Sequence, residues 1–144
     1  MLRKVLVPVD GAAGSDRVIR SLIQKQTGPN AGEPIELHLL NVQQPVAGDV
    51  RTFVADDDIK DYHRDAGAKA LHAARQALDG AGVPYRFHIS VGNPAEIIAR
   101  FAQENKCDEI FMGTRGHSGM SKLLLGSVAS DVIRLANVPV TLVK

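Results

Sequence analysis

Short runs of β-branched and other apolar residues alternate along the chain with longer segments in which apolar residues recur every three or four positions. This alternation is typical of βαβ units around a parallel sheet. The predicted strands are Lys4 to Val9, Ile35 to Val42, Tyr85 to Val91, Glu109 to Met112 and Val138 to Val143. His38 and His88 interrupt two of these strands and indicate faces that are partly exposed to water.

Four helical patterns separate the strands. The first is predicted to be capped by Ser15 or Asp16 and ended by Gly28 and Pro29. Its apolar stripe consists of Val18, Ile19, Leu22 and Ile23. The third opens with Asn93-Pro94-Ala95-Glu96, which predicts a capping box with proline at the first helical position. Its inward-facing residues are expected to be Ile97, Ile98 and Phe101.

The second helix is predicted to be long and to begin near the acidic cluster Asp56 to Asp58. Its many alanines predict a close approach to the sheet, and its histidines, His63 and His72, are expected to face solvent. The predicted stripe consists of Ile59, Tyr62, Ala66, Ala70, Ala73, Ala77 and Ala81. Between the second strand and this helix, Gln43 to Ala55 is interpreted as a surface loop in preference to a mobile cover of the site.

The fourth helix is predicted to begin at about Gly126 and Ser127 and to bury Val128, Val132 and Leu135. The chain has 144 residues, which is enough for one well-buried core and predicts a single domain over 1–144. With 17 basic and 16 acidic residues and no basic cluster, it lacks the electrostatic surface expected of a nucleic-acid-binding protein.

Cys107 is the only cysteine, so no intramolecular disulfide can form, and it is interpreted as a small apolar filler. The N-terminus lacks the pattern of a signal peptide, and no apolar run approaches the roughly 18 to 20 residues of a membrane span. These features predict a cytoplasmic protein. No cluster of ligands indicates a metal site built by the protein.

Glycine is concentrated after the fourth predicted strand, with four residues in the 14 positions from 113 to 126 against 13 in the whole chain. Glycine permits positive φ and lets main-chain N–H groups approach a bulky anion such as a phosphate chain. The helix that follows adds unpaired N–H groups and a positive dipole end. Polar and basic residues accompany the glycines: Arg115, Ser121, Lys122 and Ser127.

Phosphate binding is therefore favoured over the alternative that the glycines only shape a tight connection between the strand and the helix. The segment does not contain G-x-x-x-x-G-K-[ST], and no G-x-G-x-x-G follows the first strand, which argues against a P-loop NTPase and a dinucleotide dehydrogenase. Asp10, at the end of the first strand, has two interpretations. It could accept hydrogen bonds from ribose hydroxyls, or it could be a turn or capping residue, and the first requires strands one and four to be neighbours.

The chain resembles the universal stress protein family over essentially its whole length. The ATP-binding subgroup of that family is marked by G-x2-G-x9-G-[ST], and Gly113, Gly116, Gly126 and Ser127 satisfy every spacing. The opening Val-Leu-Val-Pro-Val-Asp-Gly and the closing Val-Pro-Val-Thr-Leu-Val are similar to the family's own segments. One departure lies in the first turn, where the family often has Asp-Gly-Ser but this chain displaces the serine to Ser15. Because of this displacement, the family's ligand contact from the turn is not expected to carry over unchanged.

The resemblance implies an open five-stranded parallel α/β sheet in the order 3-2-1-4-5 with helices on both faces, which is Rossmann-like and similar to adenine nucleotide alpha hydrolases. It implies ATP, with which Mg²⁺ could arrive, and places Asp10 on the ribose and the backbone around Pro8, Val9 and Val42 on the adenine. The residues implied around the phosphates, with neighbouring Met112, are Gly113, Arg115, Gly116, His117, Gly126, Ser127 and Val128. It also implies a homodimer through Val138 to Val143, whose apolar edge would otherwise be exposed.

Three functions are compatible with these features. The first is a nucleotide-loaded regulator of the stress response with at most slow hydrolysis. The sequence does not require any histidine or carboxylate to lie beside the γ-phosphate, and His117 could donate a hydrogen bond to a phosphate as easily as act as a base. The second is an enzyme of a related adenine-nucleotide fold that transfers a phosphoryl or adenylyl group. The third is a nucleotide-free protein-interaction factor, which the retained glycine motif disfavours. The partner protein is not identified by the sequence.

Overall fold

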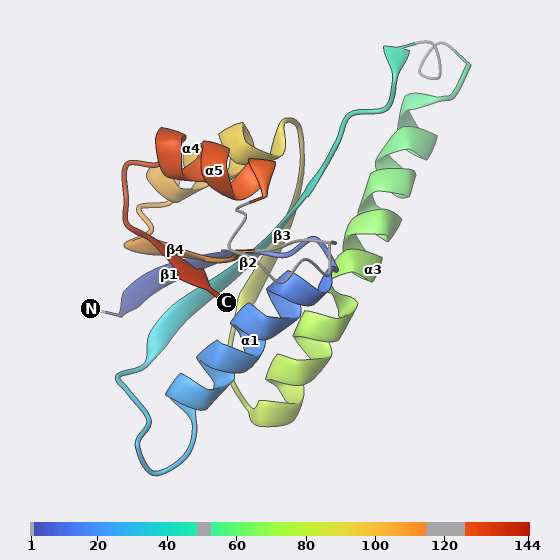
Figure 1. The fold of residues 1–144 in the computed structure, drawn as a ribbon. Coiled ribbons are helices and arrows are strands. Elements are labelled where there is room, and N and C mark those ends of the chain that lie inside the picture. The colour runs from blue at the N-terminus through green and yellow to red at the C-terminus, as the bar shows by residue number, and fades with distance from the viewer. Residues whose placement is uncertain (1, 49–52, 115–125) are drawn as a thin grey trace.

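The computed structural model describes residues 2–48, 53–114 and 126–144. Five strands form one parallel sheet in the order β3-β2-β1-β4-β5, which confirms the predicted fold class (Figure 1). The elements are β1 (Arg3–Pro8), α1 (Ala13–Gln26), β2 (Ile35–Gln43), α3 (Asp56–Ala81), β3 (Arg86–Val91), α4 (Pro94–Glu104), β4 (Glu109–Gly113), α5 (Ser127–Leu135) and β5 (Val140–Val143).

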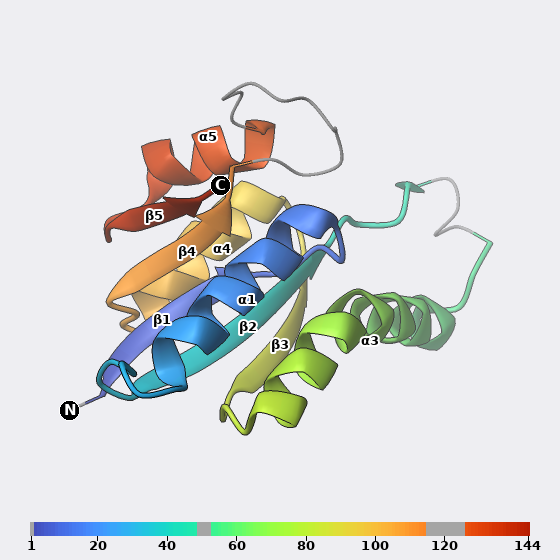
Figure 2. The same cartoon turned by 60° about the horizontal axis from the view of Figure 1, so that its bottom comes forward.

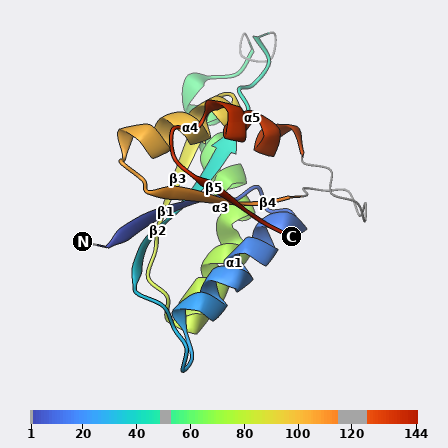
Figure 3. The same ribbon diagram turned by 60° about the vertical axis from the view of Figure 1, so that its left-hand side comes forward.

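Helices cover both faces of the sheet, with α1 and α3 on one face and α4 and α5 on the other (Figures 1 and 3). Two separate apolar cores result. The core beneath α1 and α3 is centred on Val5, Val7, Leu37, Leu39, Leu71 and Leu78. The core beneath α4 and α5 is centred on Leu6, Leu40, Ile98, Ile110 and Val132. Residues of β1 and β2 alternate between the two cores, as the period-2 geometry of a strand requires.

The strand order reverses at β1. This strand pairs with β2 on one side, where Val7 lies opposite Leu39, and with β4 on the other, where Leu6 lies opposite Ile110. The connection from β1 passes through α1, whereas β4 connects towards α5 on the opposite face. Figure 2 shows β1 and β4 side by side in the sheet, and because the two strands are parallel their carboxyl ends lie at the same end. A crevice at that end is the expected consequence of such a reversal.

The start of α4 agrees with the sequence, whereas the start of α1 does not. Asn93 Oδ1 accepts from the Glu96 N–H at 3.1 Å, and Pro94 occupies the first helical turn. In α1 the N-cap position is taken by Ala12, and Ser15 and Asp16 lie inside the helix, so the predicted cap is wrong. The physical reason is that Asp10 organises this turn by accepting from the Ala12 N–H at 2.8 Å.

The buried stripe of α3 differs from the predicted one. Its buried residues are His63, Gly67, Leu71, Ala74 and Leu78, and Tyr62 is exposed. Leu71 and Leu78 have far more apolar surface to remove from water than alanines do, so they determine which face of the helix packs. The expected close approach to the sheet occurs at Gly67, where an added Cβ would lie 2.7 Å from Ile89 Cγ2. His63 is therefore buried, contrary to expectation, whereas His72 is exposed as predicted.

Three smaller corrections concern α5, the bounds of two strands, and His38. In α5 the buried residues are Ala129 and Val132, whereas Val128 and Leu135 are exposed. The last strand begins at Val140, and the second extends through Gln43 into the predicted loop, of which 49–52 lie outside the described residues. His38 is buried, although a partly wet face was predicted for it.

Cys107 is buried, and this burial raises the pKa of its thiol, in agreement with its interpretation as an apolar filler. In the three described stretches, no helix has both the length and the apolar character needed to span a membrane.

A backbone contact between β4 and α1 fixes the inner end of the crevice. A Cβ added to Gly113 would lie 2.8 Å from the carbonyl oxygen of Gly14 and 3.0 Å from its carbonyl carbon. Because both obstacles are backbone atoms, they cannot move away as a flexible side chain would. Gly126, by contrast, has nothing within 4 Å of the same position and has an ordinary φ of −62°.

We therefore expect Gly113→Ala to lower the free energy of unfolding by about 1 to 3 kcal/mol, because it forces α1 and β4 apart. Gly126→Ser is the matched control, since serine fits the open space and is a favourable N-cap residue. Its free energy of unfolding should stay within about 0.5 kcal/mol of the wild-type value. Urea denaturation of the three proteins measures both effects, and equal stability of Gly113→Ala and wild type would contradict the contact.

Candidate functional site

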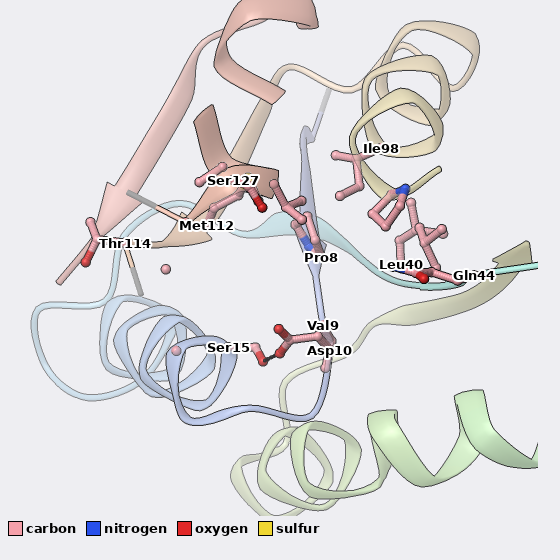
Figure 4. Close-up of a pocket in the computed structure, with 17 residues that line it drawn as sticks. Pro8, Val9, Asp10, Ser15, Leu40, Gln44, Ile98, Met112, Thr114 and Ser127 are labelled. Atoms are coloured by element: carbon pink, nitrogen blue, oxygen red, sulfur yellow. Dashed lines mark hydrogen bonds between the residues drawn. The ribbon is translucent and has the colours of Figure 1, made fainter. Parts of the chain in front are cut away.

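A cavity of about 440 Å³ lies at the carboxyl ends of β1 and β4. It is lined by the ends of β1, β2 and β4 and by the first turns of α1, α4 and α5. Figure 4 shows Leu40, Gln44 and Ile98 on one side of this pocket and Ser15 and Thr114 on the other. The volume is within the range of roughly 300 to 1,000 Å³ usual for small-molecule sites.

Most of the site residues predicted from the sequence meet in this pocket. Its lining includes Pro8, Val9, Asp10, Val42, Met112, Gly113, Gly126, Ser127 and Val128. The other predicted residues, Arg115, Gly116 and His117, lie outside the described part of the chain. Residues separated by more than 100 positions are thus brought together by the pairing of β1 with β4.

Sequence reasoning missed part of the pocket, mainly residues from β2, α4 and the first turn of α1. The additional lining residues are Gly14, Ser15, Leu40, Gln44, Pro94, Ile98, Thr114 and Ala129. A signal for α4 was present, because Asn93 and Pro94 mark a helix that begins directly after a parallel strand. Helices that begin there point their N-termini towards the same end of the sheet as the crevice.

Asp10 has the turn role, which is one of the two roles that the sequence left open. Its Oδ1 accepts from the Ala12 N–H at 2.8 Å and from the Ser15 hydroxyl at 2.9 Å, so the residue organises the β1 to α1 turn. Ser15 also donates towards the Ala12 carbonyl at 3.0 Å. The side chain is at the same time part of the pocket lining and is mostly exposed. The displaced Ser15 thus contributes to this turn after all, by holding one oxygen of Asp10 (Figure 4).

The backbone of Val9, beside Asp10, is held by β2. The Val9 N–H donates to the Leu40 carbonyl at 2.9 Å, and the Val9 carbonyl accepts from Asn41 Nδ2 at 2.8 Å. Asn41 is buried and its own Oδ1 accepts from Gln43 Nε2. This network fixes the end of β1 and uses the Val9 N–H inside the protein.

The N-terminus of α5 opens into the pocket, and no described side chain caps it. Gly126 occupies the N-cap position and makes no side-chain hydrogen bond, and the first turn contains no acidic residue. Gly126, Ser127, Val128 and Ala129 all line the pocket. The first N–H groups of a helix have no intrahelical acceptor, and the helix dipole is positive at this end. An anion in the pocket would find these groups available.

The sequence analysis allowed for positive φ at the glycines of the motif. Neither of the two described ones, Gly113 and Gly126, adopts it. Positive φ among described glycines occurs at Gly11, Gly28, Gly82 and Gly92. At Gly113 the reason for glycine is the contact with Gly14, and at Gly126 it is open space beside the helix terminus. One glycine is therefore structural, and the other leaves the end of α5 unobstructed.

The described lining has few groups that could carry out catalysis. Asp10 is its one carboxylate, and it contains no histidine, lysine or arginine. Among described residues, no group of three or more His, Cys, Asp or Glu side chains is arranged to hold a metal ion. The described geometry is suited to binding a molecule with an apolar part and an anionic part.

Comparison with known proteins agrees with this geometry. The model of the universal stress protein family matches residues 1–144. Universal stress protein MJ0531 of Methanocaldococcus jannaschii is 31% identical over 144 residues, covering 100% of this chain and 83% of the relative. The solved structure of MJ0577, from the same organism, superposes with a TM-score of 0.78 at 27% identity and covers 100% of this chain and 96% of its own.

A further solved structure is the universal stress protein of Archaeoglobus fulgidus in complex with dAMP. It has a TM-score of 0.63 and 25% identity and covers 100% of this chain and 98% of its own. The match of the family model to the complete sequence, together with these relatives and the shared fold, leads to one conclusion. This chain belongs to the universal stress protein family.

Proposed function

We propose that this protein binds ATP in the pocket at the end of β1 and β4 and acts as a nucleotide-loaded regulator with at most slow hydrolysis. The observation that carries the proposal is the convergence of an uncapped helix N-terminus, a carboxylate and an apolar wall on one cavity. In open α/β sheets, ligands bind at the point where strand order reverses. The complex of the Archaeoglobus fulgidus relative with dAMP supports an adenine nucleotide as the ligand class.

The phosphates would lie against the N-terminus of α5. The N–H groups of its first turn, which have no intrahelical acceptor, and the Ser127 hydroxyl are suitable donors to phosphate oxygens. Hydrogen bonds to charged groups contribute about 1.5 to 3 kcal/mol each, and micromolar affinity requires about 8 kcal/mol. A few such bonds therefore supply most of the affinity. The family motif adds Arg115, Gly116 and His117 to this part of the proposal, although these lie outside the described residues.

The nucleoside would occupy the other part of the pocket. Asp10 would accept from the ribose hydroxyls through Oδ2, because Oδ1 already accepts from Ala12 and Ser15. The base would pack on apolar side chains that line the pocket, namely Pro8, Leu40, Val42, Ile98 and Met112. Burial of a flat apolar ring against such a wall is favourable at about 25 cal/mol per Å².

The described lining supports the proposal of slow turnover. In-line attack on the γ-phosphate needs a group that orients or deprotonates water, and Asp10, the one carboxylate there, is held in the β1 to α1 turn. Mg²⁺ would be held mainly by phosphate oxygens, because the described residues offer no cluster of three metal-ligating side chains. When bound, the ion would neutralise part of the charge on the triphosphate.

The direct test is to denature the purified protein and analyse the released small molecules by mass spectrometry. We expect ATP, or ADP left by slow hydrolysis, close to one nucleotide per chain. Protein stripped of nucleotide should then bind ATP in an isothermal titration with a dissociation constant in the micromolar range or below. No released nucleotide and no heat of ATP binding at pH 7.5 would contradict the proposal.

The variant Asp10→Asn isolates the ribose contact. Asparagine keeps an oxygen that can accept from the Ala12 N–H and the Ser15 hydroxyl, but it places an amide where the ribose hydroxyls need an acceptor. We expect ATP to bind about tenfold more weakly, which is about 1.4 kcal/mol, and tripolyphosphate to bind almost as in the wild type. Equal losses for both ligands would show that Asp10 acts on the phosphates or on the turn alone.

We also infer that two copies associate through β5. This strand pairs with β4 on one side, and its other side is an edge of the described sheet. Edge strands with unpaired backbone groups and apolar side chains are natural sites for pairing with a second chain. The apolar residues that are only partly covered there are Val140, Leu142 and Val143, with exposed Ile133 and Leu135 on the neighbouring α5.

Sedimentation velocity at micromolar protein concentration is expected to give about twice the 15.4 kDa mass of the chain. A species that remains a monomer up to about 100 µM would overturn the association and leave the nucleotide proposal untouched.

A further inference from the structure

A chain of three titratable side chains lies on the α4 face of the sheet. His38 Nε2 is 2.7 Å from Glu36 Oε2, and His38 Nδ1 is 2.9 Å from His88 Nε2. The two imidazole rings are nearly parallel, with centroids 5.2 Å apart and an interplanar angle of 13°. His38 is buried, and His88 is partly buried. None of the three residues lines the pocket.

The hydrogen bonds determine where the protons lie at neutral pH. A carboxylate can only accept, so the Nε2 atom of His38 carries the hydrogen that faces Glu36. The Nδ1 atom of neutral His38 is then an acceptor, and His88 must donate to it from Nε2. The pair can take up one proton and keep both hydrogen bonds. A second proton would place two N–H groups against each other at 2.9 Å and would break the contact.

Other charged groups act on Glu36, His38 and His88 from the surrounding elements. Lys4 of β1 is 3.5 Å from Glu36 and also donates to the Asn105 carbonyl, which follows α4. Arg86, on the same strand as His88, repels a charge on that ring. Among described residues, the group of α4 that contacts the pair is the uncharged ring of Phe101. Beyond it, the buried Cys107 thiol lies within electrostatic range of Glu36 and Lys4.

Desolvation, then the charge of His38 and then that of Arg86, lower the pKa of His88 from its usual value of 6.5. The hydrogen bond from His38 is the main cause that lowers the pKa of Glu36, so this carboxylate stays charged well below neutral pH. The folded protein therefore accepts the second proton less readily than the unfolded chain does. Below about pH 6.5 the unfolded state binds more protons, and stability falls as the pH falls.

Helix α4 connects the hydrogen-bonded His38 and His88 pair to the pocket. Phe101 has its ring centroid 4.7 Å from that of His88 and 6.2 Å from that of His38. One turn earlier on the same helix, Ile98 lines the pocket, as does Pro94 at the helix start. Leu40, another pocket residue, lies opposite His88 in the β2 to β3 register. A displacement of the His88 ring would therefore reach the apolar wall of the pocket through two routes.

We propose that uptake of a second proton by the His38 and His88 pair displaces Phe101 and α4 and thereby weakens nucleotide binding at mildly acidic pH. This inference rests on the proposed nucleotide site, and it makes the protein a sensor of both nucleotide and proton concentration. By reciprocity, bound nucleotide holds α4 in place and makes the second protonation still less favourable. The two ligands therefore oppose each other.

The first arm of the experiment uses nucleotide-free protein. His88→Gln retains a donor for His38 Nδ1 and removes the titration, and His72→Gln makes the same chemical change at an exposed position of α3. Between pH 7.5 and 5.5, we expect the Tm of wild type and of His72→Gln to fall at least about 3 °C further than that of His88→Gln. An equal fall in all three proteins overturns the proton-uptake site.

The second arm measures the dissociation constant of ATP at the same two pH values. The triphosphate and residues shared by all three proteins titrate alike in each, so only the difference between variants reports on His88. We expect the affinity of wild type and of His72→Gln to fall at least threefold more than that of His88→Gln. Binding at pH 7.5 with identical pH dependence overturns the coupling alone. Absence of binding at pH 7.5 overturns the proposed function, and the coupling with it.

A measurement on the wild type guards against a variant that folds poorly. Long-range nitrogen-15 spectra of the histidine side chains distinguish the two tautomers and follow each ring through its titration. At pH 7.5 both rings should carry hydrogen on Nε2, and the midpoint of His88 should lie below 6.5 and shift further down when ATP is added. A His88 that titrates at or above 6.5, or a midpoint insensitive to ATP, contradicts the proposal.

Discussion

The structure depends on the reversal of strand order at β1. Because β1 pairs with both β2 and β4, the chain leaves the sheet towards α1 on one face and towards α5 on the other. Among the described residues, a cavity lies where the carboxyl ends of these two strands meet. The close contact between Gly113 and the Gly14 carbonyl holds the end of β4 against the first turn of α1. Fold and pocket are therefore consequences of the same topological constraint.

The strands and their class of sheet could be predicted from the sequence because buried parallel strands leave an unambiguous pattern of continuous apolar residues. Helix faces were less predictable where the pattern was degenerate. In α3, alanines occur on several faces, and only the larger Leu71 and Leu78 select the one that packs. His63 is carried inside with them. The start of α1 was mispredicted because a turn stabilised by Asp10 leaves no need for a capping side chain.

The candidate site was predictable to the extent that its residues carry a local signature. Asp10 and the glycines at 113 and 126 are recognisable by their position after strands and before helices. Leu40 and Ile98 are not, because an apolar residue that lines a cavity has the same appearance in a sequence as one that fills a core. The Glu36, His38 and His88 chain was equally hidden. His38 and His88 are 50 positions apart and meet only through the β2 to β3 register.

The hydrogen bond from the Val9 amide to the Leu40 carbonyl has a consequence for ligand choice. Purines are usually told apart by donors and acceptors around the ring, and an amide already committed to β2 cannot take part in that discrimination. Recognition of the proposed nucleotide base at this end of β1 would therefore depend on groups other than the Val9 N–H. Selectivity between one purine and another would then have to be encoded elsewhere in the cavity wall.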